Sequence, residues 1–434
     1  MFYKLQALLL KRPILSIVVF NSISRFIIAL FYWHVTIFPD SGDYIALTDR
    51  LLSASVSGYE GYRTPGYPLL LALAGNILWL AVIYQVICGI VTAIYQYKTI
   101  VLLGFNKKTA VYTTLFMNAL IHVAFYEFAI LTEAFTLLCI TLCFYHIFKI
   151  FINKTGIAHI LFTSLLLGWL VLIKPFYIFI PFLVYALYTL KDFSFRRVIN
   201  TCLLLTVFPL IAFLGWSYLN KHNTGYFTST TYFGINLAQM CVYFAEDAHD
   251  EYPIISDVYV NYRKQVIQQN EDVAMTIWFA REELQQKTGL TSIPDLSNEL
   301  AGFSKTAIKN NPGAYLKQVF LSWREFWFSA MYWNYQDFNI PYSNKMFTAL
   351  WRAQQFVIII LEIAFILLII PYYLFQFFVK RKISLGAIAT FMVFAASVLQ
   401  AMVTFGTNSR FSYPFEPLLF ISLLLFFKEK IRID

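Results

Sequence analysis

The sequence predicts an all-α polytopic membrane protein, a bundle of about ten transmembrane helices within a range of roughly nine to thirteen. Two observations support this fold class. First, 59% of the 434 residues are hydrophobic and only 13% are charged, a balance that excludes an ordinary soluble domain. Second, apolar stretches of about 20 residues, the length that crosses a bilayer as a helix, recur along the chain.

The apolar stretches give the expected elements in order. Residues 64–97 carry no charge and are too many for one span, and Gly66, Pro68 and Gly75 interrupt them. We therefore expect residues 66–78 to form a re-entrant or interfacial piece. The candidate spans are residues 13–33, 79–104, 109–126, 130–151, 157–173, 175–190, 198–218, 350–379, 383–404 and 411–427.

Clusters of lysine and arginine between the spans predict the orientation. If the N-terminus is cytoplasmic, every cluster falls on the cytoplasmic side, as the positive-inside rule requires. Both termini are then cytoplasmic, and the protein lies in the plasma (inner) membrane. The net charge of +9 reflects this topology and an affinity for anionic lipid, so we expect no nucleic-acid partner. The clusters are Lys107/Lys108, Lys149/Lys154, Lys191/Arg196/Arg197, Lys380/Arg381/Lys382 and Lys428/Lys430/Arg432.

One outer segment, residues 219–349, has a different composition and divides the chain into three parts. Residues 219–345 hold 13 acidic and 10 basic side chains, so this stretch is acidic in an otherwise basic protein. It separates an N-terminal transmembrane core, residues 1–218 with the first outer loop at 34–78, from C-terminal transmembrane helices in residues 350–434.

The outer segment is expected to contain helices of its own. Residues 271–287 and 297–310 have helical patterns, with Pro294 and Pro312 as stops. Residues 311–333 are apolar but contain charged side chains, which favours an amphipathic helix at the membrane surface over a span.

The outer loop after the first span is unusually polar for this chain. It reads PDSGDYIALTDRLLSASVSGYEGYRTPGYP over residues 39–68. Asp40 and Asp43 are separated by one helical turn, so a helix capped by Asp40 or Ser41 lets both carboxylates face one point. One carboxylate can accept a proton from a hydroxyl nucleophile, and a pair can hold a divalent cation. The alternative is a helix N-cap followed by a surface acid.

The loop ends in the sequence RTPGYP, which begins at Arg63. Pro65 and Pro68 restrict the backbone, and Gly66 permits a close approach to another segment. Arg63 is thus held at a defined place at the membrane surface. It can form bidentate bonds with a phosphate group of a bound molecule, or it can extend to lipid headgroups as an ordinary interfacial arginine.

Two further acids flank an outer turn in the sequence YEFAILTEAF. Glu133 follows Thr132 and opens a span. If Glu133 has only a structural role, its carboxylate is stabilised there by the dipole of the helix that it opens. An acid buried at membrane depth is also a functional candidate, and this applies to both Glu127 and Glu133.

Two further cations lie at the same outer level. Lys174 precedes Pro175 at a break between two apolar stretches, where it either extends to the interface or contacts a phosphate. Arg410 precedes the last span. It either pairs with Glu416 or faces the region of Asp40.

These motifs occur together in a known family. The acidic motif in the first outer loop, the RTPGYP corner, the Thr-Glu motif opening a later helix and the Arg-aromatic motif before the last span resemble those of GT-C integral-membrane glycosyltransferases. The most similar groups are the bacterial protein mannosyltransferase-like and lipid A aminoarabinose transferase-like enzymes. The resemblance covers residues 1–218 well and residues 383–427 loosely, and residues 219–349 match no family motif.

The resemblance implies a GT-C-like bundle with an outer-face loop domain and a glycosyltransferase activity, hexosyl or pentosyl. Such enzymes use a sugar linked to polyprenyl phosphate and act on the extracytoplasmic face. The expected partners are this donor, an envelope glycan, lipid or protein acceptor, and the bilayer. The sequence contains no GxGxxG or Walker motif for a nucleotide sugar, which agrees with a lipid-linked donor.

The resemblance also implies roles for single residues. Asp40 is the expected base, spaced from Tyr44 as in the family. Ser41 stands where many relatives have Glu, so Asp43 is expected to replace that second acid. Asp40 and Asp43 together are the expected ligands of a divalent metal, Mg or Mn, if one is bound. The remaining roles are donor-phosphate binding by Arg63, Lys174 and Arg410, support by the acids Glu133 and Glu127, and positioning by Tyr44, Pro65, Gly66 and Tyr67.

Two other functions are compatible with the sequence. A lipid-linked oligosaccharide polymerase or ligase would use the same kind of donor on the same face. A transporter or flippase would carry ionisable residues within its spans and often repeated halves. Arg25 and Glu362 are such residues, but the sequence shows no internal repeat.

Overall fold

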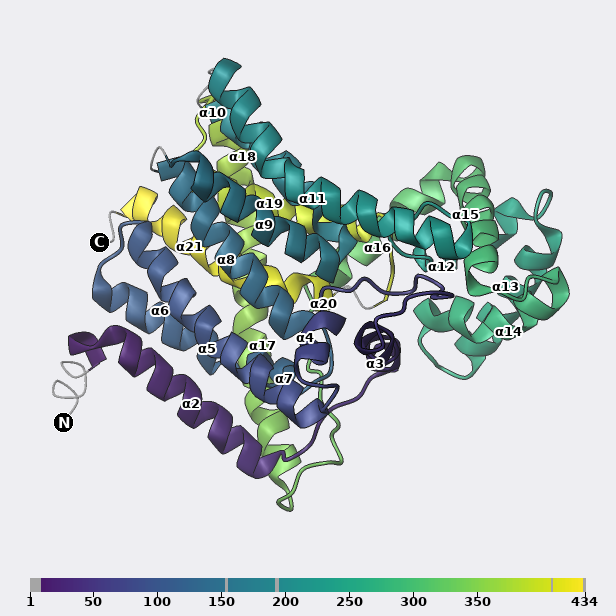
Figure 1. Cartoon of the computed structure of the whole chain (residues 1–434), viewed down its shortest axis with the longest axis horizontal. Coiled ribbons are helices and arrows are strands. Elements are labelled where there is room, and N and C mark those ends of the chain that lie inside the picture. The colour runs from purple at the N-terminus through teal and green to yellow at the C-terminus, as the bar shows by residue number, and fades with distance from the viewer. Residues whose placement is uncertain (1–8, 153–154, 192–194, 407–408, 432–434) are drawn as a thin grey trace.

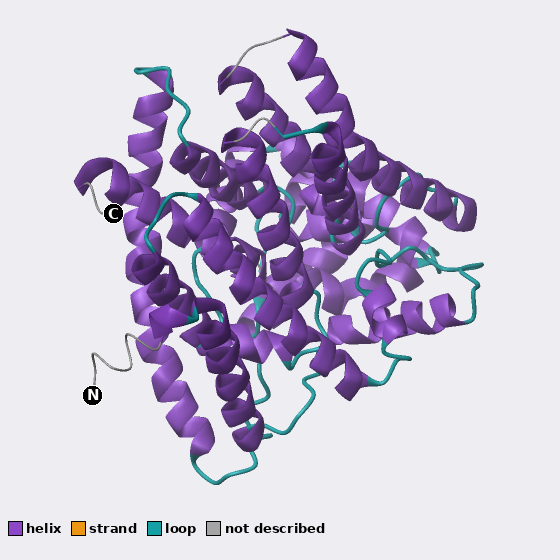
Figure 2. Cartoon of the chain, turned by 60° about the vertical axis from the view of Figure 1, so that its left-hand side comes forward, coloured by secondary structure: helices purple, strands orange, loops and turns teal. Residues whose placement is uncertain are grey.

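The computed structural model describes residues 9–152, 155–191, 195–406 and 409–431, and most of these residues lie in helices. Within these ranges no strand is formed, and the parallel bridge between Thr36 and Ala129 is an isolated one. The predicted all-α class is therefore confirmed. Figure 2 shows the helices and the short loops that join them.

The N-terminal half contains long apolar helices with a short helical loop after the first. Its elements are α2 (Pro13–Phe31), α3 (Pro39–Leu52), α4 (Pro68–Leu73), α5 (Leu78–Leu102), α6 (Lys107–Ala119), α7 (Ile121–Glu127), α8 (Glu133–Ile152), α9 (Ile157–Ile173), η1 (Pro175–Ile178), α10 (Phe179–Lys191) and α11 (Phe195–Thr224).

The outer segment forms shorter helices, and long apolar helices then return. These elements are α12 (Phe233–Gln239), η2 (Ala245–Ala248), α13 (Pro253–Gln268), η3 (Val273–Met275), α14 (Thr276–Thr288), α15 (Ile293–Asn310), α16 (Pro312–Phe326), α17 (Ser343–Ala364), the π-helix η4 (Phe365–Ile369), α18 (Ile370–Phe378), α19 (Leu385–Ala401), α20 (Ser409–Ser412), η5 (Tyr413–Phe415) and α21 (Glu416–Ile431).

The apolar helices agree with the predicted spans. Among the described residues, six helices are long and apolar enough to cross a membrane, and the bent pair α6–α7 makes a seventh if it counts as one span. Three shorter apolar helices cover residues 157–173, 175–191 and 385–401. A multi-pass membrane protein is therefore supported, while the total of about ten spans stays a prediction.

The structure has two packed regions (Figure 1). The apolar helices form a large bundle with one main core, whereas α12 to α15 lie at one end around a second core that includes Phe244, Tyr259 and Phe303. Helix α11 extends from the bundle towards this smaller region. The separate core explains why the segment after residue 219 has soluble character.

Some predicted boundaries differ from the structure. Pro294 does not end a helix, because α14 ends at Thr288 and Pro294 lies in the first turn of α15, where no intrahelical N–H bond is lost. The predicted helix end before Pro312 is confirmed, since α15 ends at Asn310, and Pro312 then lies in the first turn of α16. Helix α13 (Pro253–Gln268) was not among the predicted helices. The predicted span 350–379 begins earlier, at Ser343, and continues through the π-helical turn to Phe378.

The start of α3 is tied to the turn that precedes α8. Phe38, not Asp40 or Ser41, is the N-cap residue. The Ser41 hydroxyl accepts a bond from the Phe38 N–H at 3.0 Å and donates to the Ile130 carbonyl at 2.7 Å. Thr36 adds two backbone bonds to the same turn, from its N–H to Phe128 and from Ile130 to its carbonyl. These bonds place the first turn of α3 beside the N-terminus of α8.

The RTPGYP corner packs against the end of α9. The Gly66 N–H donates to the Leu172 carbonyl at 2.8 Å, and a Cβ atom on Gly66 would lie 2.5 Å from the backbone of Leu172 and Ile173. Thr64 donates to the Ile173 carbonyl at 3.0 Å. The predicted close approach at Gly66 is confirmed, and it brings Arg63 near Lys174, the residue that follows α9.

A buried ion pair links the first span to α7. Arg25 donates to both carboxylate oxygens of Glu127, at 3.0 Å and 2.8 Å, and both side chains are at most 3% exposed. The Gln85 amide donates to the carbonyls of Glu127 and Ala129. The pair therefore fixes the turn that leads into α8.

Arg25→Met should destabilise the protein by about 3–5 kcal/mol, because it leaves the Glu127 carboxylate buried without a partner. Thermal unfolding of the purified protein in detergent measures this loss. The double variant Arg25→Met/Glu127→Gln should recover most of it, since no uncompensated charge then remains. A single variant as stable as the original protein would contradict a structural role for the pair.

Candidate active site

Six charged side chains form one continuous, alternating chain of ion pairs. Asp43 accepts from Arg63 Nε at 3.1 Å, and Arg63 Nη2 donates to Asp40 Oδ1 at 2.7 Å. The other Asp40 oxygen accepts from Arg410 Nη1 at 2.7 Å. Arg410 Nε and Lys174 Nζ both donate to Glu133 Oε1 at 3.0 Å. The members, hereafter the charge network, are Asp43, Arg63, Asp40, Arg410, Glu133 and Lys174.

The charge network is assembled from five separate parts of the chain. Its members come from the first turns of α3, the corner after it, the N-terminus of α8, the junction of α9 and η1, and α20. Figure 1 shows α3, α4 and α20 on the side of the bundle that faces α12 to α15. Asp40 and Arg410 are 370 positions apart in the sequence.

Aromatic rings hold the cations of the network in place. The Arg63 guanidinium lies over the rings of Tyr44, at 5.0 Å, and Tyr232, at 5.2 Å. Arg410 lies 5.6 Å from the Tyr332 ring, and Lys174 lies 4.6 Å from the Phe411 ring. Such cation–π contacts favour the charged form and limit the positions that each side chain can adopt.

The network runs from a buried end to an accessible end. The Glu133 side chain is fully buried, whereas Asp43 and Asp40 are 26% and 31% exposed. Partial burial raises the pKa of Asp40, but the guanidinium groups of Arg63 and Arg410 outweigh it and hold the pKa of this carboxyl well below its usual range. Asp40 is therefore a carboxylate at any ordinary pH and can be approached from solution.

The predicted positioning residues surround the network without adding charge to it. Tyr44 is buried and packs edge-on against Tyr67 with ring centres 5.2 Å apart. The Tyr67 hydroxyl donates to Gln85 Oε1 at 3.0 Å. Pro65 and Gly66 form the corner itself, which holds Arg63 towards Asp40.

The structure separates Glu127 from the charge network and identifies the partner of Arg410. Glu127 pairs with Arg25, so its side chain supports the fold and does not reach the other acids. Arg410 does not pair with Glu416. It faces Asp40, which is the second of the two possibilities that the sequence left open. Glu416 contacts His122 Nε2 at 2.8 Å and the Ser329 hydroxyl at 3.1 Å instead.

The arrangement at Asp40 and Asp43 does not fit a divalent metal. Both Asp40 oxygens and Asp43 Oδ2 accept bonds from arginine, so positive charge already occupies the positions that a cation would take. Among the described residues, no group of three or more His, Cys, Asp or Glu side chains could hold a metal ion.

Sequence reasoning missed two aromatic residues that the outer segment contributes. The Tyr232 hydroxyl donates to Asp43 at 3.2 Å, and the Tyr232 ring stacks on Tyr62 with ring centres 4.9 Å apart. Tyr332 lies under Arg410 and stacks on Tyr126. With 29 tyrosines in the chain, no local pattern distinguishes these two.

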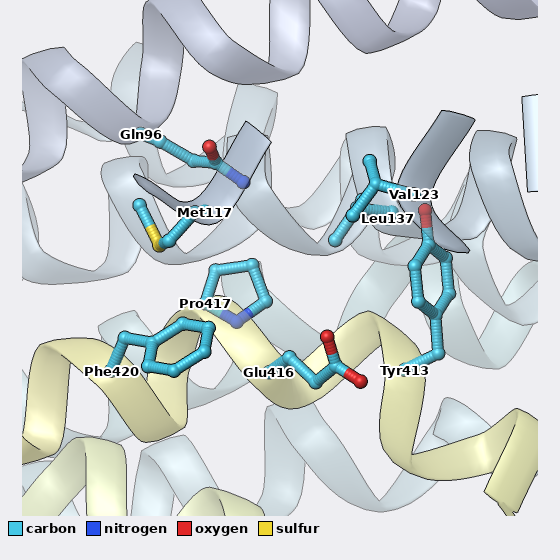
Figure 3. Close-up of a pocket in the computed structure, with 8 residues that line it drawn as sticks. All are labelled: Gln96, Met117, Val123, Leu137, Tyr413, Glu416, Pro417 and Phe420. Carbon is cyan, nitrogen blue, oxygen red and sulfur yellow. The ribbon is translucent and has the colours of Figure 1, made fainter. Parts of the chain in front are cut away.

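A small cavity lies behind the network within the bundle. Its volume is about 10 Å³, close to the space of one water molecule. Figure 3 shows the Glu416 carboxylate beside the cavity and the Tyr413 ring at its edge. Tyr413 packs against Tyr126 with ring centres 4.2 Å apart, so a layer of aromatic rings separates the cavity from Arg410. The cavity is too small for a sugar or a phosphate group.

Comparisons with known proteins gave one likeness. No protein-family model and no curated protein matches the chain. Among solved structures, the chain is similar to ArnT from Cupriavidus metallidurans in the apo state, with 12% identity over 94% of this chain and 77% of that one and a TM-score of 0.39.

Asp40→Asn should lower the melting temperature by about 2–5 °C at pH 7, because Arg63 and Arg410 both lose their shared partner. The depressed pKa gives the sign of the pH dependence. The stabilisation by ionised Asp40 is fully present above the unfolded value of 3.8 and is lost as the pH falls below it. The difference in melting temperature between the original protein and Asp40→Asn should thus stay constant from about pH 8 to 5 and shrink below about pH 4. Melting curves at stepped pH measure it; a difference that grows on acidification would contradict the ion-pair assignment.

Proposed function

We propose that this protein is a membrane glycosyltransferase of the GT-C type that transfers a sugar from a polyprenyl-phosphate-linked donor to an acceptor on the extracytoplasmic face. The charge network carries the proposal. It brings Asp40, Asp43, Arg63, Glu133, Lys174 and Arg410 into one partly accessible site, and these are residues to which the sequence resemblance gives catalytic, supporting or phosphate-binding roles.

The cations of the network suit the phosphate of such a donor. Arg63 and Arg410 are held by rings and by Asp40, so their N–H groups are oriented before any substrate arrives. Lys174 adds a third positive charge 3.0 Å from Glu133. Fixed cations at this site would stabilise the charge that builds up on the departing phosphate.

Asp40 is the residue that would take the proton. In the proposed step the acceptor hydroxyl oxygen bonds to the anomeric carbon, and the bond from that carbon to the phosphate oxygen breaks. The hydroxyl proton passes to Asp40, and polyprenyl phosphate leaves with the electron pair of the broken bond. The low pKa of Asp40 is compatible with this role, because in an oxocarbenium-like reaction the proton leaves late, when the attacking oxygen is already strongly acidic. One displacement inverts the anomeric carbon.

The rest of the molecule supplies the surroundings that this reaction needs. Long apolar helices suit a polyprenyl tail, and many of their large side chains are exposed, such as Phe26, Ile87 and Phe356. The positive-inside pattern supports an outer-face site, cytoplasmic termini and residence in the plasma (inner) membrane. The acceptor in this proposal is an envelope glycan, a lipid or a protein.

The alternatives differ in what they require of the site. A lipid-linked oligosaccharide polymerase or ligase would use the same network with a longer acceptor, so product size distinguishes it from a single-sugar transferase. A transporter or flippase is less well supported, because Arg25, one of the two ionisable residues that favoured it, is neutralised by Glu127 in the bundle.

Asp40→Asn should reduce sugar transfer by about 10²- to 10⁴-fold, the usual contribution of a general base. The assay uses membranes that contain the variant and a radiolabelled polyprenyl-phosphate sugar, with transfer to envelope material as the readout. Asp49→Asn is the matched control, since Asp49 lies on the same helix and contacts Asn76, away from the network. Full transfer by Asp40→Asn at equal protein levels would remove Asp40 from this role.

A further inference from the structure

The charge network leaves no cation free for an incoming phosphate. Three carboxylates and three cations alternate along it, so their formal charges cancel. A phosphate that binds the Nε or Nη2 group of Arg63, or the Nε or Nη1 group of Arg410, must therefore compete with a carboxylate that is already bound there. The carboxylate that is bound least firmly is the one that a phosphate would displace.

Glu133 and Asp40 are firmly held. Glu133 is fully buried and accepts from two cations, Arg410 and Lys174. Asp40 accepts from two arginines at 2.7 Å, one on each oxygen. Releasing either acid would leave two cations with one partner fewer, which is costly in a partly buried site.

Asp43 is held far less firmly. Within the described part of the chain it contacts one cation, Arg63, at the longer distance of 3.1 Å, and its second contact is the neutral Tyr232 hydroxyl at 3.2 Å. Both bonds use the same oxygen, Oδ2, and the side chain is 26% exposed. Asp43 also lies at the end of the network, so its departure interrupts none of the other pairs.

The geometry of Arg63 directs an anion to the place that Asp43 occupies. Tyr44 and Tyr232 lie over its guanidinium group, so an anion must reach it along the edge of the plane. Asp43 occupies Nε, and Asp40 occupies the neighbouring Nη2. With Asp40 still bound to Nη2, the departure of Asp43 opens the Nε–H group for a charge-assisted bond to a phosphate oxygen.

We propose that the phosphate of the lipid-linked donor displaces Asp43 from Arg63, and that Asp43 fills this anion subsite in the substrate-free protein. The inference rests on the proposed function and gives Asp43 a role other than base or metal ligand. Its consequence is unusual for a site residue: removing its charge strengthens binding of the phosphate. The Tyr232 hydroxyl donates to Asp43 and thus helps to hold it in the subsite.

The test is the binding of farnesyl phosphate, a short prenyl phosphate, to the purified full-length protein in detergent. Asp43→Asn should bind it about 2- to 10-fold more tightly, since one competing ion pair is removed. Tyr232→Phe keeps the ring over Arg63 but loses the bond to Asp43, so its affinity should rise by a smaller factor. Asp49→Asn, on the same helix, should match the original protein.

The outcomes separate the inference from the proposed function. Unchanged or weaker binding by Asp43→Asn, in a protein with an unaltered melting curve, means that the phosphate does not replace Asp43, and the inference is then wrong. If the original protein and all variants fail to bind farnesyl phosphate, the lipid-phosphate donor itself is wrong. Inorganic phosphate tests whether the headgroup alone suffices, and farnesol, which lacks the phosphate, should show no gain in Asp43→Asn.

Discussion

Charge compensation at the edge of an apolar bundle is the constraint on which the rest of this structure depends. A charge that leaves water costs several kcal/mol unless a partner and hydrogen bonds replace its hydration. The protein meets this requirement with an alternating network, in which Asp40 bridges Arg63 and Arg410 and Glu133 bridges Arg410 and Lys174. Because no member is satisfied alone, five parts of the chain have to meet at one place.

The fold brings these parts together with uncharged contacts. Ser41 ties the first turn of α3 to the turn before α8, and Gly66 lets the RTPGYP corner contact the backbone at the end of α9. Gln85 links the Tyr67 hydroxyl to the same turn before α8. The side chains that would do the chemistry are thus supported by backbone bonds, which hold positions more firmly than surface ion pairs do.

The outer segment takes part in the site although its sequence matches no family motif. Tyr232 and Tyr332 place their rings over Arg63 and Arg410, and Tyr232 also holds Asp43. A region with its own small core therefore helps to determine the electrostatics of a site at the edge of the bundle. In the proposed glycosyltransferase, this is where differences in the outer segment would affect which substrates bind.

The sequence by itself determined the membrane class, the positions of the apolar helices and the residue types of the site, because length, hydrophobicity and charge act locally along the chain. It could not determine the partners. Arg410 had two candidate acids in the sequence, and only the position of α20, which packs against α16 and α19, brought it to Asp40 and Glu133 and not to Glu416. Glu127 was an equally good candidate until the structure placed it against Arg25. Contacts between residues hundreds of positions apart depend on how whole helices pack, and no local pattern records that.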